Sequence, residues 1–470
     1  MSTEKFDLIV IGGGPAGHKA AIQAAKVGKR VLLTDLQQAV GGECVHRGTI
    51  PSKTLRETAL SLWSTSKLAP KLFESSMAGG VKVESLMRNL DSVRDAHARF
   101  MSAQLERNGI TRWRGRAKFH SEHEISVRGP ELSDRVAYGE RILIATGSRP
   151  RRPDNIPVDH EHILDSDSIL SLIYLPSSLT VIGSGVIACE FATVFAALGV
   201  DVTIIDKYER PLAFMDPELI DCFLESFKSM GGTFLPKREI EKVAWDGLSA
   251  VETTLESGEV IRSEKMFVAQ GRIACVNDLN LEVAGVEVSN RGTVVVDKFC
   301  QSSAPHVYAA GDAIGPPALA AASMEQGRRA ALHAFDLPAP EESSTLPIGI
   351  YTIPEMASVG MSEEQAIAEH GSAVVGRSKF EELARGQICG DVGGMLKLVA
   401  DPSGKQLLGA HIVGHGATEL IHVAQMAIQA GTTIDVFVDS IFNFPTMAEG
   451  YRVAAIKIVQ ARPAQIRRAG

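Results

Sequence analysis

The chain of 470 residues has few cysteines, and no two of them form a short motif. Because no Cys-x-x-Cys occurs and no His-rich stretch accompanies a cysteine, the sequence predicts no zinc site and no other metal site. Scattered cysteines are typical of a reducing compartment, so we expect the protein in the cytoplasm. The cysteines are Cys44, Cys189, Cys222, Cys275, Cys300 and Cys389.

The chain also lacks an excess of positive charge. Its 48 lysine and arginine residues are outnumbered by 56 aspartate and glutamate residues, which gives a formal net charge of −8. This balance disfavours a nucleic acid or an anionic membrane as partner, since both are recognised largely through basic surface. A long uninterrupted apolar run is missing too, because Val181–Ile205, the most apolar long stretch, contains Glu190 and several glycines. We interpret this stretch as buried core and not as a membrane span.

Aromatic residues are scarce, at 6%, and exclude nothing by themselves. A hydrophobic content of 45% and a charged content of 22% are ordinary for a folded globular protein and exclude general disorder. At roughly 150 residues per domain, the length predicts about three domains. The 43 glycines follow no repeat period, which indicates tight turns or backbone close to ligands.

A β-turn-α-β pattern is present near the N-terminus. Leu8–Ile11 is a short apolar run typical of a buried parallel strand, and Lys19–Val27 is an alanine-rich helical stretch. A second strand is predicted over Val31–Thr34 and ends at Asp35. The turn before the helix contains Gly12, Gly14 and Gly17 in the spacing Gly-x-Gly-x-x-Gly. In this pattern the backbone turns tightly and approaches a pyrophosphate at the N-terminus of the helix.

The same pattern returns later in the chain. A strand over Leu179–Ile182 precedes a helix over Ile187–Leu198, and a further strand over Asp201–Ile205 ends at Asp206. The turn holds Gly183, Gly185 and Ala188, and the first glycine and the terminal acid are as far apart as in the first unit. The sequence therefore predicts two equivalent dinucleotide sites in one chain.

Asp206 is placed to accept hydrogen bonds from the ribose hydroxyls of an adenosine, which favours NAD over NADP. Lys207 and Arg210 follow it and could partly neutralise a 2′-phosphate. A role for these two cations in cofactor binding and a role as solvated surface charges are both consistent with the sequence. The preference between NAD and NADP stays open at this point.

The remaining segments suggest a division of the chain. A helical region is expected from about Thr54 to Asn108, a strand over Val307–Ala310, a helix from about Ala318 to Ala334 and an exposed linker over Leu337–Ser344. We expect a first domain part over 1–150, a second dinucleotide domain over 151–272, a return to the first domain over 273–344 and a C-terminal domain over 345–470.

The segment from Gly41 to Lys53 reads Gly-Gly-Glu-Cys-Val-His-Arg-Gly-Thr-Ile-Pro-Ser-Lys. With the two glycine turns, it resembles the two-dinucleotide-binding flavoproteins, the family of dihydrolipoamide dehydrogenase, glutathione reductase and soluble pyridine nucleotide transhydrogenase. The family's redox-disulfide segment is Gly-Gly-x-Cys-x-x-x-x-Cys-Ile-Pro-Ser-Lys, and here Thr49 replaces the second cysteine. A dithiol relay needs two sulfurs within bonding reach, so this chain is expected to work without one. Cys44 is then either a free thiol near the flavin or a small buried residue.

A second departure lies near the C-terminus, where Asn-Phe-Pro-Thr-Met-Ala-Glu resembles the family's His-Pro-Thr-x-x-Glu. In the family, His and Glu form the acid-base pair for the thiols. Phe444 replaces the histidine, and Glu449 keeps the position of the glutamate. A phenyl ring cannot exchange a proton, so thiol chemistry is expected to lack its base as well.

The resemblance implies an α/β fold with two Rossmann-like domains, for FAD and for NAD(P), and an α+β C-terminal dimerisation domain. The segment from Gly349 to Glu355, followed by Ala357 to Gly360, resembles the family's interface domain and implies a homodimer. Lys53 and Glu190 match the ion pair beside the flavin N5, and Asp312 matches the residue that binds the ribityl chain. The free amides of a helix starting within Ala318–Ala322 would point at N1 and the C2 oxygen of the flavin. The residues expected to bind FAD are Gly12, Gly14, Gly17, Asp35, Gly41, Gly42, Cys44, Lys53, Ala117, Thr146, Gly147, Asp312 and Ala320. Those expected to bind NAD(P) are Gly183, Gly185, Ala188, Glu190, Asp206, Lys207 and Gly271.

Within the family, Thr49 and Phe444 make the chain most similar to the soluble, Si-specific pyridine nucleotide transhydrogenases. The expected reaction is a two-step hydride exchange, in which FAD takes a hydride from NADPH and gives it to NAD⁺, or the reverse. The alternatives are an NAD(P)H diaphorase or quinone reductase, a dihydrolipoamide-dehydrogenase-like protein without disulfide chemistry, and a flavin-binding scaffold without turnover.

Overall fold

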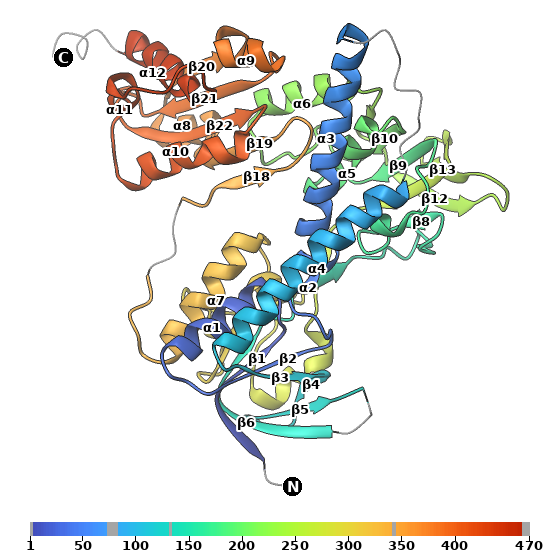
Figure 1. Cartoon of the computed structure of the whole chain (residues 1–470), viewed down its shortest axis with the longest axis vertical. Coiled ribbons are helices and arrows are strands. Elements are labelled where there is room, and N and C mark those ends of the chain that lie inside the picture. The colour runs from blue at the N-terminus through green and yellow to red at the C-terminus, as the bar shows by residue number, and fades with distance from the viewer. Residues whose placement is uncertain (1–2, 73–82, 131–133, 341–344, 463–470) are drawn as a thin grey trace.

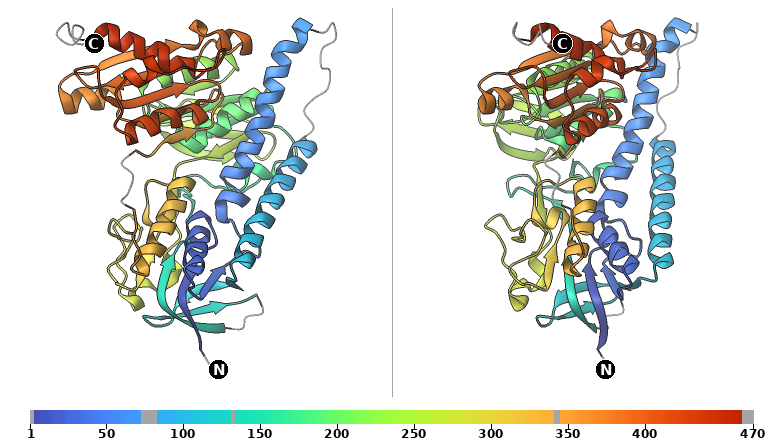
Figure 2. Two further views of the ribbon diagram at one scale, coloured as in Figure 1. Left: turned by 60° about the vertical axis from the view of Figure 1, so that its left-hand side comes forward. Right: turned by 90° about the vertical axis from the view of Figure 1, so that its left-hand side faces the viewer.

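The computed structural model describes residues 3–72, 83–130, 134–340 and 345–462. The N-terminal sheet lies at one end of the long axis of the molecule, and the sheet of the second dinucleotide unit and the C-terminal sheet lie beside each other toward the other end (Figures 1 and 2). Residues 341–344 of the predicted linker lie outside the described residues, and so do residues 463–470 at the C-terminus. Among the described helices, none is long and apolar enough to cross a membrane.

The first sheet has seven strands in the order β3-β2-β1-β6-β5-β4, with β17 paired to β6. Strands β1, β2, β3, β6 and β17 run parallel, so their carboxyl ends lie at one edge. The last four residues of β1 are all buried, which matches its continuous apolar run. The strands are β1 Glu4–Ile11, β2 Val31–Asp35, β3 Thr111–Arg114, β4 Arg116–Phe119, β5 Glu124–Arg128, β6 Asp134–Ile144 and β17 Val307–Ala309.

Two helices, α1 (Pro15–Lys26) and α7 (Ala320–Ala334), pack against each other on this sheet (Figure 1). Small residues let them approach closely, because a Cβ atom at Gly327 of α7 would lie 2.1 Å from the Ala16 carbonyl oxygen of α1. Helix α7 begins at Ala320, two residues later than the predicted Ala318, because Leu319 still has extended backbone and caps the helix.

The second sheet has the order β11-β10-β9-β15-β8, with the parallel pairs expected of a dinucleotide-binding unit. Helix α5 (Val186–Ala197) connects β9 to β10, and ten of its residues are buried. The interpretation of Val181–Ile205 as buried core is therefore confirmed. The strands of this sheet are β8 Ile163–Leu164, β9 Ser178–Ile182, β10 Asp201–Ile205, β11 Thr233–Leu235 and β15 Lys265–Val268.

A separate antiparallel sheet, β12-β13-β14, follows β11, and helix α6 (Pro217–Ser229) lies between β10 and β11 in the chain. A short antiparallel pair, β7 with β16, connects the first two sheets. The remaining bounds in this part are β7 Ser148–Pro150, β12 Ile240–Trp245, β13 Val251–Leu255, β14 Val260–Ser263 and β16 Arg272–Ala274, with 3₁₀ turns over Ile169–Ser171, Asn277–Leu279, Leu281–Ala284 and Gly311–Ile314.

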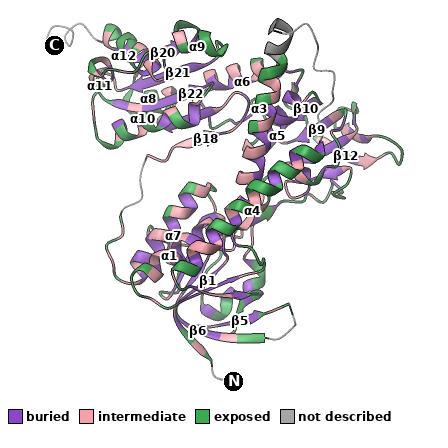
Figure 3. Ribbon diagram, viewed as in Figure 1, coloured by how far each residue is buried: buried purple, intermediate pink, exposed green. Residues whose placement is uncertain are grey.

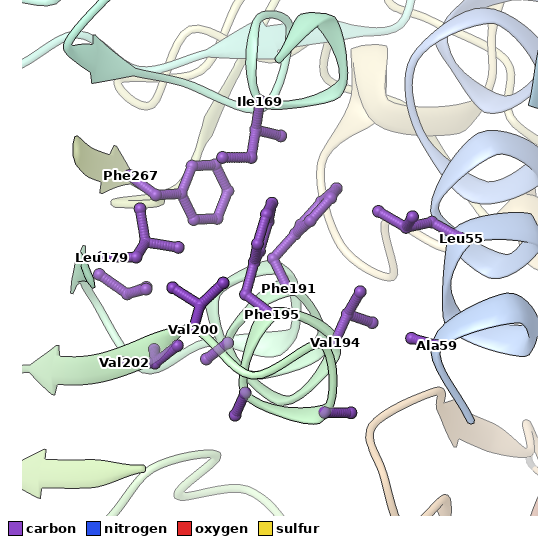
Figure 4. Packing of buried hydrophobic residues seen from close by; sticks show 14 of the residues in the cluster. Leu55, Ala59, Ile169, Leu179, Phe191, Val194, Phe195, Val200, Val202 and Phe267 are labelled. Carbon is purple, nitrogen blue, oxygen red and sulfur yellow. The ribbon is translucent and has the colours of Figure 1, made fainter. Parts of the chain in front are cut away.

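Two long helices, α3 (Thr49–Leu72) and α4 (Val83–Arg107), pack against each other along the molecule. The predicted helical region Thr54–Asn108 is thus two helices, with residues 73–82 outside the described part. Helix α3 packs on α5, where Leu55 and Ala59 face Phe191 and Val194 (Figure 4). The outer side of α4 is largely exposed (Figure 3). This packing carries the start of α3 to the second dinucleotide unit.

The C-terminal sheet has five antiparallel strands in the order β18-β19-β22-β21-β20. One face is covered by α12, against β20 and β21, and by α10, against β19 and β22, and the buried side chains of both helices form one cluster with the sheet. The other face meets α6 of the second dinucleotide unit. The elements are β18 Ile348–Ile350, β19 Met356–Gly360, β20 Val374–Lys379, β21 Met395–Ala400, β22 Leu407–Val413, α8 Glu363–His370, α9 Ala384–Cys389, α10 Ala417–Gln429, α11 Asp435–Asp439 and α12 Glu449–Ala461, with a 3₁₀ turn over Phe380–Glu382.

Candidate dinucleotide and flavin site

Four of the residues predicted to bind FAD follow neighbouring strands of the first sheet. Ile11 of β1 is in register with Thr34 of β2 and with Ile144 of β6, which is in turn in register with Ala309 of β17. Gly12, Asp35, Thr146 and Asp312 come at or just after these strand ends. Because carboxyl ends of parallel strands form the usual ligand edge of such sheets, the topology brings these residues to one place.

The first glycine turn permits only glycine at two of its positions. Gly12 has a φ of +107°, and a Cβ there would lie 2.2 Å from the Ala145 carbonyl oxygen. A Cβ at Gly17 would lie 1.9 Å from the Gly12 carbonyl oxygen. At Gly14, in contrast, an added Cβ would meet only the Cα of Gly42, at 3.8 Å. The turn is therefore tightly packed at Gly12 and Gly17 and open at Gly14, whereas a Cβ at Gly42 would lie 2.9 Å from the Cα of Gly14.

The helix that follows this turn begins without a side-chain cap. Gly14 is the N-cap of α1 and supplies no side-chain hydrogen bond. Gly41, at a φ of +124°, donates its amide to the Gly13 carbonyl oxygen at 2.9 Å, which holds the second glycine segment beside the first. Uncapped amides at a helix N-terminus, next to backbone without side chains, are suited to bind a pyrophosphate.

Asp35 closes the other side of this turn. Its Oδ2 accepts a hydrogen bond from the Gly13 amide at 2.6 Å, and its Oδ1 accepts one from the Gln37 amide at 2.7 Å. Burial raises the pKa of this carboxyl group, while the two amide hydrogen bonds act in the opposite direction. A cavity of about 220 Å³ lies beside it, lined by Leu33, Asp35, Gln37, Gln38, Arg112, Trp113 and Arg114.

Ala117 lies nearby in β4, but its side chain is 7% exposed and belongs to the apolar core. Only its backbone is therefore left to contact a ligand. Gly147 has a φ of +68° and accepts a hydrogen bond from the Cys275 amide at 2.9 Å. This bond ties the end of β6 to the segment after β16.

Asp312 is held by a chain of hydrogen bonds that the sequence did not reveal. The Ser148 hydroxyl donates to its Oδ2. Arg272 in turn donates its Nε to the Ser148 hydroxyl at 2.8 Å and a terminal nitrogen to the Ser148 carbonyl oxygen at 2.7 Å. The arginine and the serine belong to β16 and β7, and only the pairing of these two strands brings them together.

Lys53 and Glu190 form an ion pair at 2.6 Å, from the start of α3 and from α5. The lysine side chain is 24% exposed and that of the glutamate 8%. The second carboxylate oxygen of Glu190 accepts a hydrogen bond from the Tyr351 amide at 2.9 Å, and Lys53 Nζ lies 5.0 Å from the centroid of the Tyr351 ring. The pair thus joins three parts of the chain and is nearly enclosed.

Cys44 lies in the short helix α2 (Gly42–His46). Thr49, the residue predicted to replace a second redox cysteine, begins the next helix, α3. Burial raises the pKa of the Cys44 thiol, and a hydrogen bond with the Thr49 side chain and the charge of Lys53 only partly oppose this. A raised pKa keeps the thiol protonated at neutral pH, and a protonated thiol is a poor nucleophile. None of the cysteines in the described part of the chain forms a disulfide.

Phe444 is 75% exposed, in the loop between α11 and α12, and Ile441 of the same loop is 95% exposed. Glu449 begins α12, and its Oε2 accepts a weak hydrogen bond from the Thr446 amide at 3.4 Å. Within the described part of a single chain, neither Phe444 nor Glu449 is among the residues that contact Lys53 or Cys44.

The second glycine turn has the same construction as the first. Gly183 has a φ of +98°, and a Cβ there would lie 2.8 Å from the Ala269 carbonyl oxygen. Gly185 caps α5 without a side-chain hydrogen bond, and a Cβ added to it would meet nothing within 4 Å. Ala188 is fully buried on the inner face of α5. Gly271, at a φ of +96°, follows the neighbouring strand β15 and is equally open.

Asp206 directly follows β10 and lies beside this turn. The Ser184 hydroxyl donates to its Oδ2 at 2.7 Å, and the Tyr208 amide donates to its Oδ1 at 3.2 Å. Of the two cations after it, Lys207 stays close, with Nζ 5.4 Å from the centroid of the Tyr208 ring. Arg210 turns away and pairs with Asp221 of α6 at 3.2 Å. The role of Arg210 beside a 2′-phosphate stays a prediction, and its guanidinium is engaged by an exposed ion pair in this structure.

The residues present fit FAD at the first unit. The Thr146 hydroxyl is buried without a hydrogen-bond partner, at the edge where Gly12, Asp35 and Asp312 meet. The N-termini of α1 and α7 both lack a capping side chain. A buried hydroxyl without a partner and uncapped helix amides are polar groups that a bound phosphate or sugar would satisfy.

Sequence reasoning missed Ser148, Arg272 and the Tyr351 amide. Ser148 and Arg272 each stand next to a predicted glycine, Gly147 and Gly271, and that adjacency was the one local signal for them. The Tyr351 amide carries no signal of any kind in the sequence, because a backbone donor is present at every residue except proline.

Comparison with known proteins agrees with this geometry. The family model for pyridine nucleotide-disulphide oxidoreductases matches residues 6–327, and the model for the dimerisation domain of that family matches residues 346–455. The chain is 41% identical over 458 residues to the soluble pyridine nucleotide transhydrogenase of Mycobacterium tuberculosis, with 97% of each chain covered. It is 39% identical to that of Hahella chejuensis, over 97% of this chain and 98% of the relative.

Solved structures show the same fold. LpdA from Mycobacterium tuberculosis superposes with a TM-score of 0.89 at 25% identity, over 97% of this chain and 100% of that one. The HOCl-induced flavoprotein disulfide reductase RclA from Escherichia coli gives a TM-score of 0.87 at 26% identity, over 96% and 99%. The predicted fold class, with two Rossmann-like units and a dimerisation domain, is confirmed. This chain belongs to the pyridine nucleotide-disulphide oxidoreductase family, and the two relatives compared above are soluble pyridine nucleotide transhydrogenases.

Proposed function

We propose that this chain is an FAD-dependent NAD(P)⁺ transhydrogenase that exchanges a hydride between NADPH and NAD⁺ without a redox-active disulfide. The relatives named soluble pyridine nucleotide transhydrogenases, matched over nearly the full length, support the activity. The observation that carries the disulfide-free mechanism is the residue five positions after Cys44, which is Thr49 and not a second cysteine. When bound, FAD supplies a two-electron acceptor that takes a hydride from one nicotinamide and returns it to another.

The chain's own residues then bind, orient and provide charge. Gly12, Gly14 and the first turn of α1 would hold the pyrophosphate of FAD, and Asp35 and Asp312 would hold its sugar hydroxyls. Lys53 would place a fixed cation near the reacting ring, with Glu190 setting its position through the 2.6 Å ion pair. No side chain needs to act as a general base, because a hydride transfer between aligned rings moves no separate proton.

The nicotinamide dinucleotide would bind along the second glycine turn, with Asp206 at its adenosine end. Glu190 lies in α5, directly after this turn, so the same helix would contact both the dinucleotide and Lys53. This arrangement allows the two nicotinamides to use one site in turn.

Assembly and location are part of the proposal. The match to the family's dimerisation domain supports a homodimer. Exposed apolar side chains on the C-terminal domain, Met426, Ile441 and Phe444 among them, are suited to an interface. We also place the protein in the cytoplasm. By similarity to the soluble transhydrogenases, we assign hydride transfer to the Si face of the nicotinamide ring.

The test counts electrons. Anaerobic titration of the purified holoenzyme with NADPH should reduce the flavin with one two-electron equivalent per FAD. The reduced enzyme, separated from NADP⁺, should then return its electrons to NAD⁺ or thio-NAD⁺ in a single turnover. If the flavin is reduced but passes its electrons only to a quinone, the protein is a quinone reductase and the proposed function is wrong.

The variant Thr49→Cys sharpens the test of the disulfide-free step. Because Cys44 lies in α2 and Thr49 begins α3, which packs against α2, the two sulfurs of this variant should lie within reach of a disulfide. The variant should take up a second two-electron equivalent, whereas Thr49→Ser should behave as the wild type. A wild type that takes up two equivalents would contradict the mechanism.

A further inference from the structure

The strand next to β10 brings additional positive charge to Asp206. Ile205 of β10 is in register with Leu235 of β11, and the Asp206 amide donates to the Leu235 carbonyl oxygen at 3.2 Å. The backbone pairing continues past both strands, because the Arg238 amide donates to the Asp206 carbonyl oxygen at 2.9 Å. Arg238 is thus adjacent in space to the residue that ends β10, although it follows 32 positions later in the sequence.

Lys237 accompanies Arg238 on the same segment. Its amide donates to the Tyr208 carbonyl oxygen at 3.2 Å, so the segment after β11 is bound to the segment after β10 at two points. Lys237 has a φ of +55°, a value that only a few per cent of non-glycine residues adopt and that such double anchoring can maintain. The backbone of Arg238 is therefore fixed beside Asp206.

The cations around Asp206 differ in how far they are already engaged. Arg210 pairs with Asp221, and Lys237 pairs with Glu209 at 3.0 Å. Arg238 is exposed, and the contact that its guanidinium makes within the described residues is a marginal one of 3.5 Å with the neighbouring Lys237 carbonyl oxygen. Lys207 is likewise exposed and lies over Tyr208. Arg238 and Lys207 are therefore the two cations free to meet a ligand here.

We propose that Arg238, with Lys207, binds the 2′-phosphate of NADP(H), whereas Asp206 binds the ribose hydroxyls of NAD(H), so that one adenosine subsite serves both dinucleotides. This inference rests on the proposed function, since it assigns the nucleotide specificity of the same site. Ordinary single-cofactor sites use either the acid or the cation. A transhydrogenase has to accept both dinucleotides, and the structure pairs the backbone of Arg238 with that of Asp206, so that an acid and a cation stand on adjacent segments.

The charges of the two ligands explain the division of roles. A phosphate monoester carries about −1.5 to −2 charges at neutral pH and would be repelled by the Asp206 carboxylate. The Ser184 hydroxyl and the Tyr208 amide already hold that carboxylate against the glycine turn. A guanidinium presents a planar fork of donors that matches a phosphate, so Arg238 can offset the repulsion at short range.

The experiment measures ligand affinity on the FAD-bound protein by calorimetry, with ADP-ribose and 2′-phospho-ADP-ribose as probes. In Arg238→Gln, the Kd of the phosphorylated probe should rise roughly 10- to 100-fold, while that of ADP-ribose should change by less than about twofold. Arg238→Lys should recover part of the loss. Arg210→Gln is the matched control, because it removes a nearby cation that faces α6, and it should leave the ratio of the two Kd values unchanged.

A second variant tests the opposite direction. Asp206→Asn should weaken ADP-ribose and strengthen the phosphorylated probe, because it removes the repulsion and a strong hydrogen-bond acceptor together. Wild-type affinity for the phosphorylated probe should also fall more steeply with ionic strength than affinity for ADP-ribose, and Arg238→Gln should reduce that difference.

Two outcomes overturn the inference: an unchanged affinity ratio in Arg238→Gln, or a loss in Arg210→Gln as large as in Arg238→Gln. Failure of the proposed function gives a different result. In that case the wild-type flavin is not reduced by NADPH, or the reduced flavin passes its electrons to a quinone and not to NAD⁺, while the affinity ratio of the two redox-inactive probes still decides the role of Arg238.

Discussion

Breaking the buried Lys53–Glu190 ion pair should destabilise the protein far more than breaking an exposed ion pair of the same length. At 2.6 Å and an effective dielectric constant of about 20, the attraction between two unit charges is about 6 kcal/mol. Desolvation of the two groups offsets part of it. Replacing one partner removes the attraction but leaves the other charge in the enclosed site, and such single replacements cost about 3–5 kcal/mol.

The two single variants should differ. Lys53→Met leaves a carboxylate whose side chain is 8% exposed, with the Tyr351 amide as its remaining hydrogen-bond donor among the described contacts. Glu190→Gln leaves an ammonium group on a side chain that is 24% exposed and can reach water more easily. Lys53→Met should therefore be the more destabilising variant. The double variant Lys53→Met/Glu190→Gln should recover most of the loss, because no charge is left unpaired.

Arg88 and Glu84 provide the matched control. They also lie 2.6 Å apart, but their side chains are 74% and 85% exposed. Arg88→Met should cost about 1 kcal/mol or less, because solvent screens an exposed pair.

The assay is hydrogen exchange on the FAD-bound protein, followed in peptides that contain Tyr351, together with urea unfolding. The exchange reports the local free energy of opening, which stays meaningful in a multidomain protein that does not unfold in two states. The reasoning is refuted if Lys53→Met exchanges no faster at Tyr351 than Arg88→Met, or if the double variant loses the sum of the two single losses.

Three further predictions concern the flavin site, the glycine turns and pH. Thr146→Val should weaken FAD binding and leave the apoprotein at least as stable as the wild type, because it removes a buried hydroxyl that has no hydrogen-bond partner. Equilibrium FAD titration and apoprotein melting measure the two effects. An unchanged FAD affinity would contradict the assignment of Thr146 to the flavin site. Gly185→Ala should preserve folding and flavin content, since its Cβ meets nothing within 4 Å in the protein, but the added methyl group should weaken NAD(P)H binding. Gly17→Ala should prevent flavin incorporation, because its Cβ would lie 1.9 Å from the Gly12 carbonyl oxygen. Equal losses of flavin in both variants would contradict this distinction between the two turns. Burial lowers the pKa of His18 to about 4 from its ordinary value of 6.5. Between pH 6.5 and 4 the unfolded chain therefore binds a proton at His18 that the folded chain does not. The free energy of unfolding should fall as the pH drops through this range. Urea unfolding at several pH values should show this dependence weakened in His18→Gln, which can keep the hydrogen bond to the Met101 carbonyl oxygen, and a slope unchanged from the wild type would be evidence against it.

Local patterns sufficed for the parts of the fold that depend on neighbouring residues. The two glycine turns, with a strand before and a helix after each, are specified by backbone sterics, since Gly12, Gly17 and Gly183 leave no room for a Cβ. The apolar stretch Val181–Ile205 was interpretable as core because apolar side chains surround α5 on all sides. Helix ends were less accurate, as at Ala320, because an end depends on where a single residue such as Leu319 leaves the extended conformation.

The predicted site residues are distributed in space by pairings between distant segments, which no local pattern contains. Parallel strand register brings Gly12, Asp35, Thr146 and Asp312 to one edge, and the roles assigned to them remain predictions. Sequence adjacency suggested Arg210 as a neighbour of a 2′-phosphate, but the chain turns after Asp206 and directs Arg210 to α6.

By itself, the sequence determined that the chain contains two dinucleotide-binding turns, and that Thr49 and Phe444 occupy the places of the family's second cysteine and histidine. Chemical identity is a property of single residues, so the loss of a sulfur and of a proton carrier needs no coordinates. The tertiary structure alone decided which groups meet: Lys53 with Glu190, 137 residues apart, Ser148 with both Asp312 and Arg272, and the backbone of Arg238 with that of Asp206. The physical reason is that ion pairs and hydrogen bonds act over a few ångströms. Residues far apart in sequence come that close only through tertiary contacts, which here are the packing of α3 on α5 and the pairing of β7 with β16 and of β10 with β11.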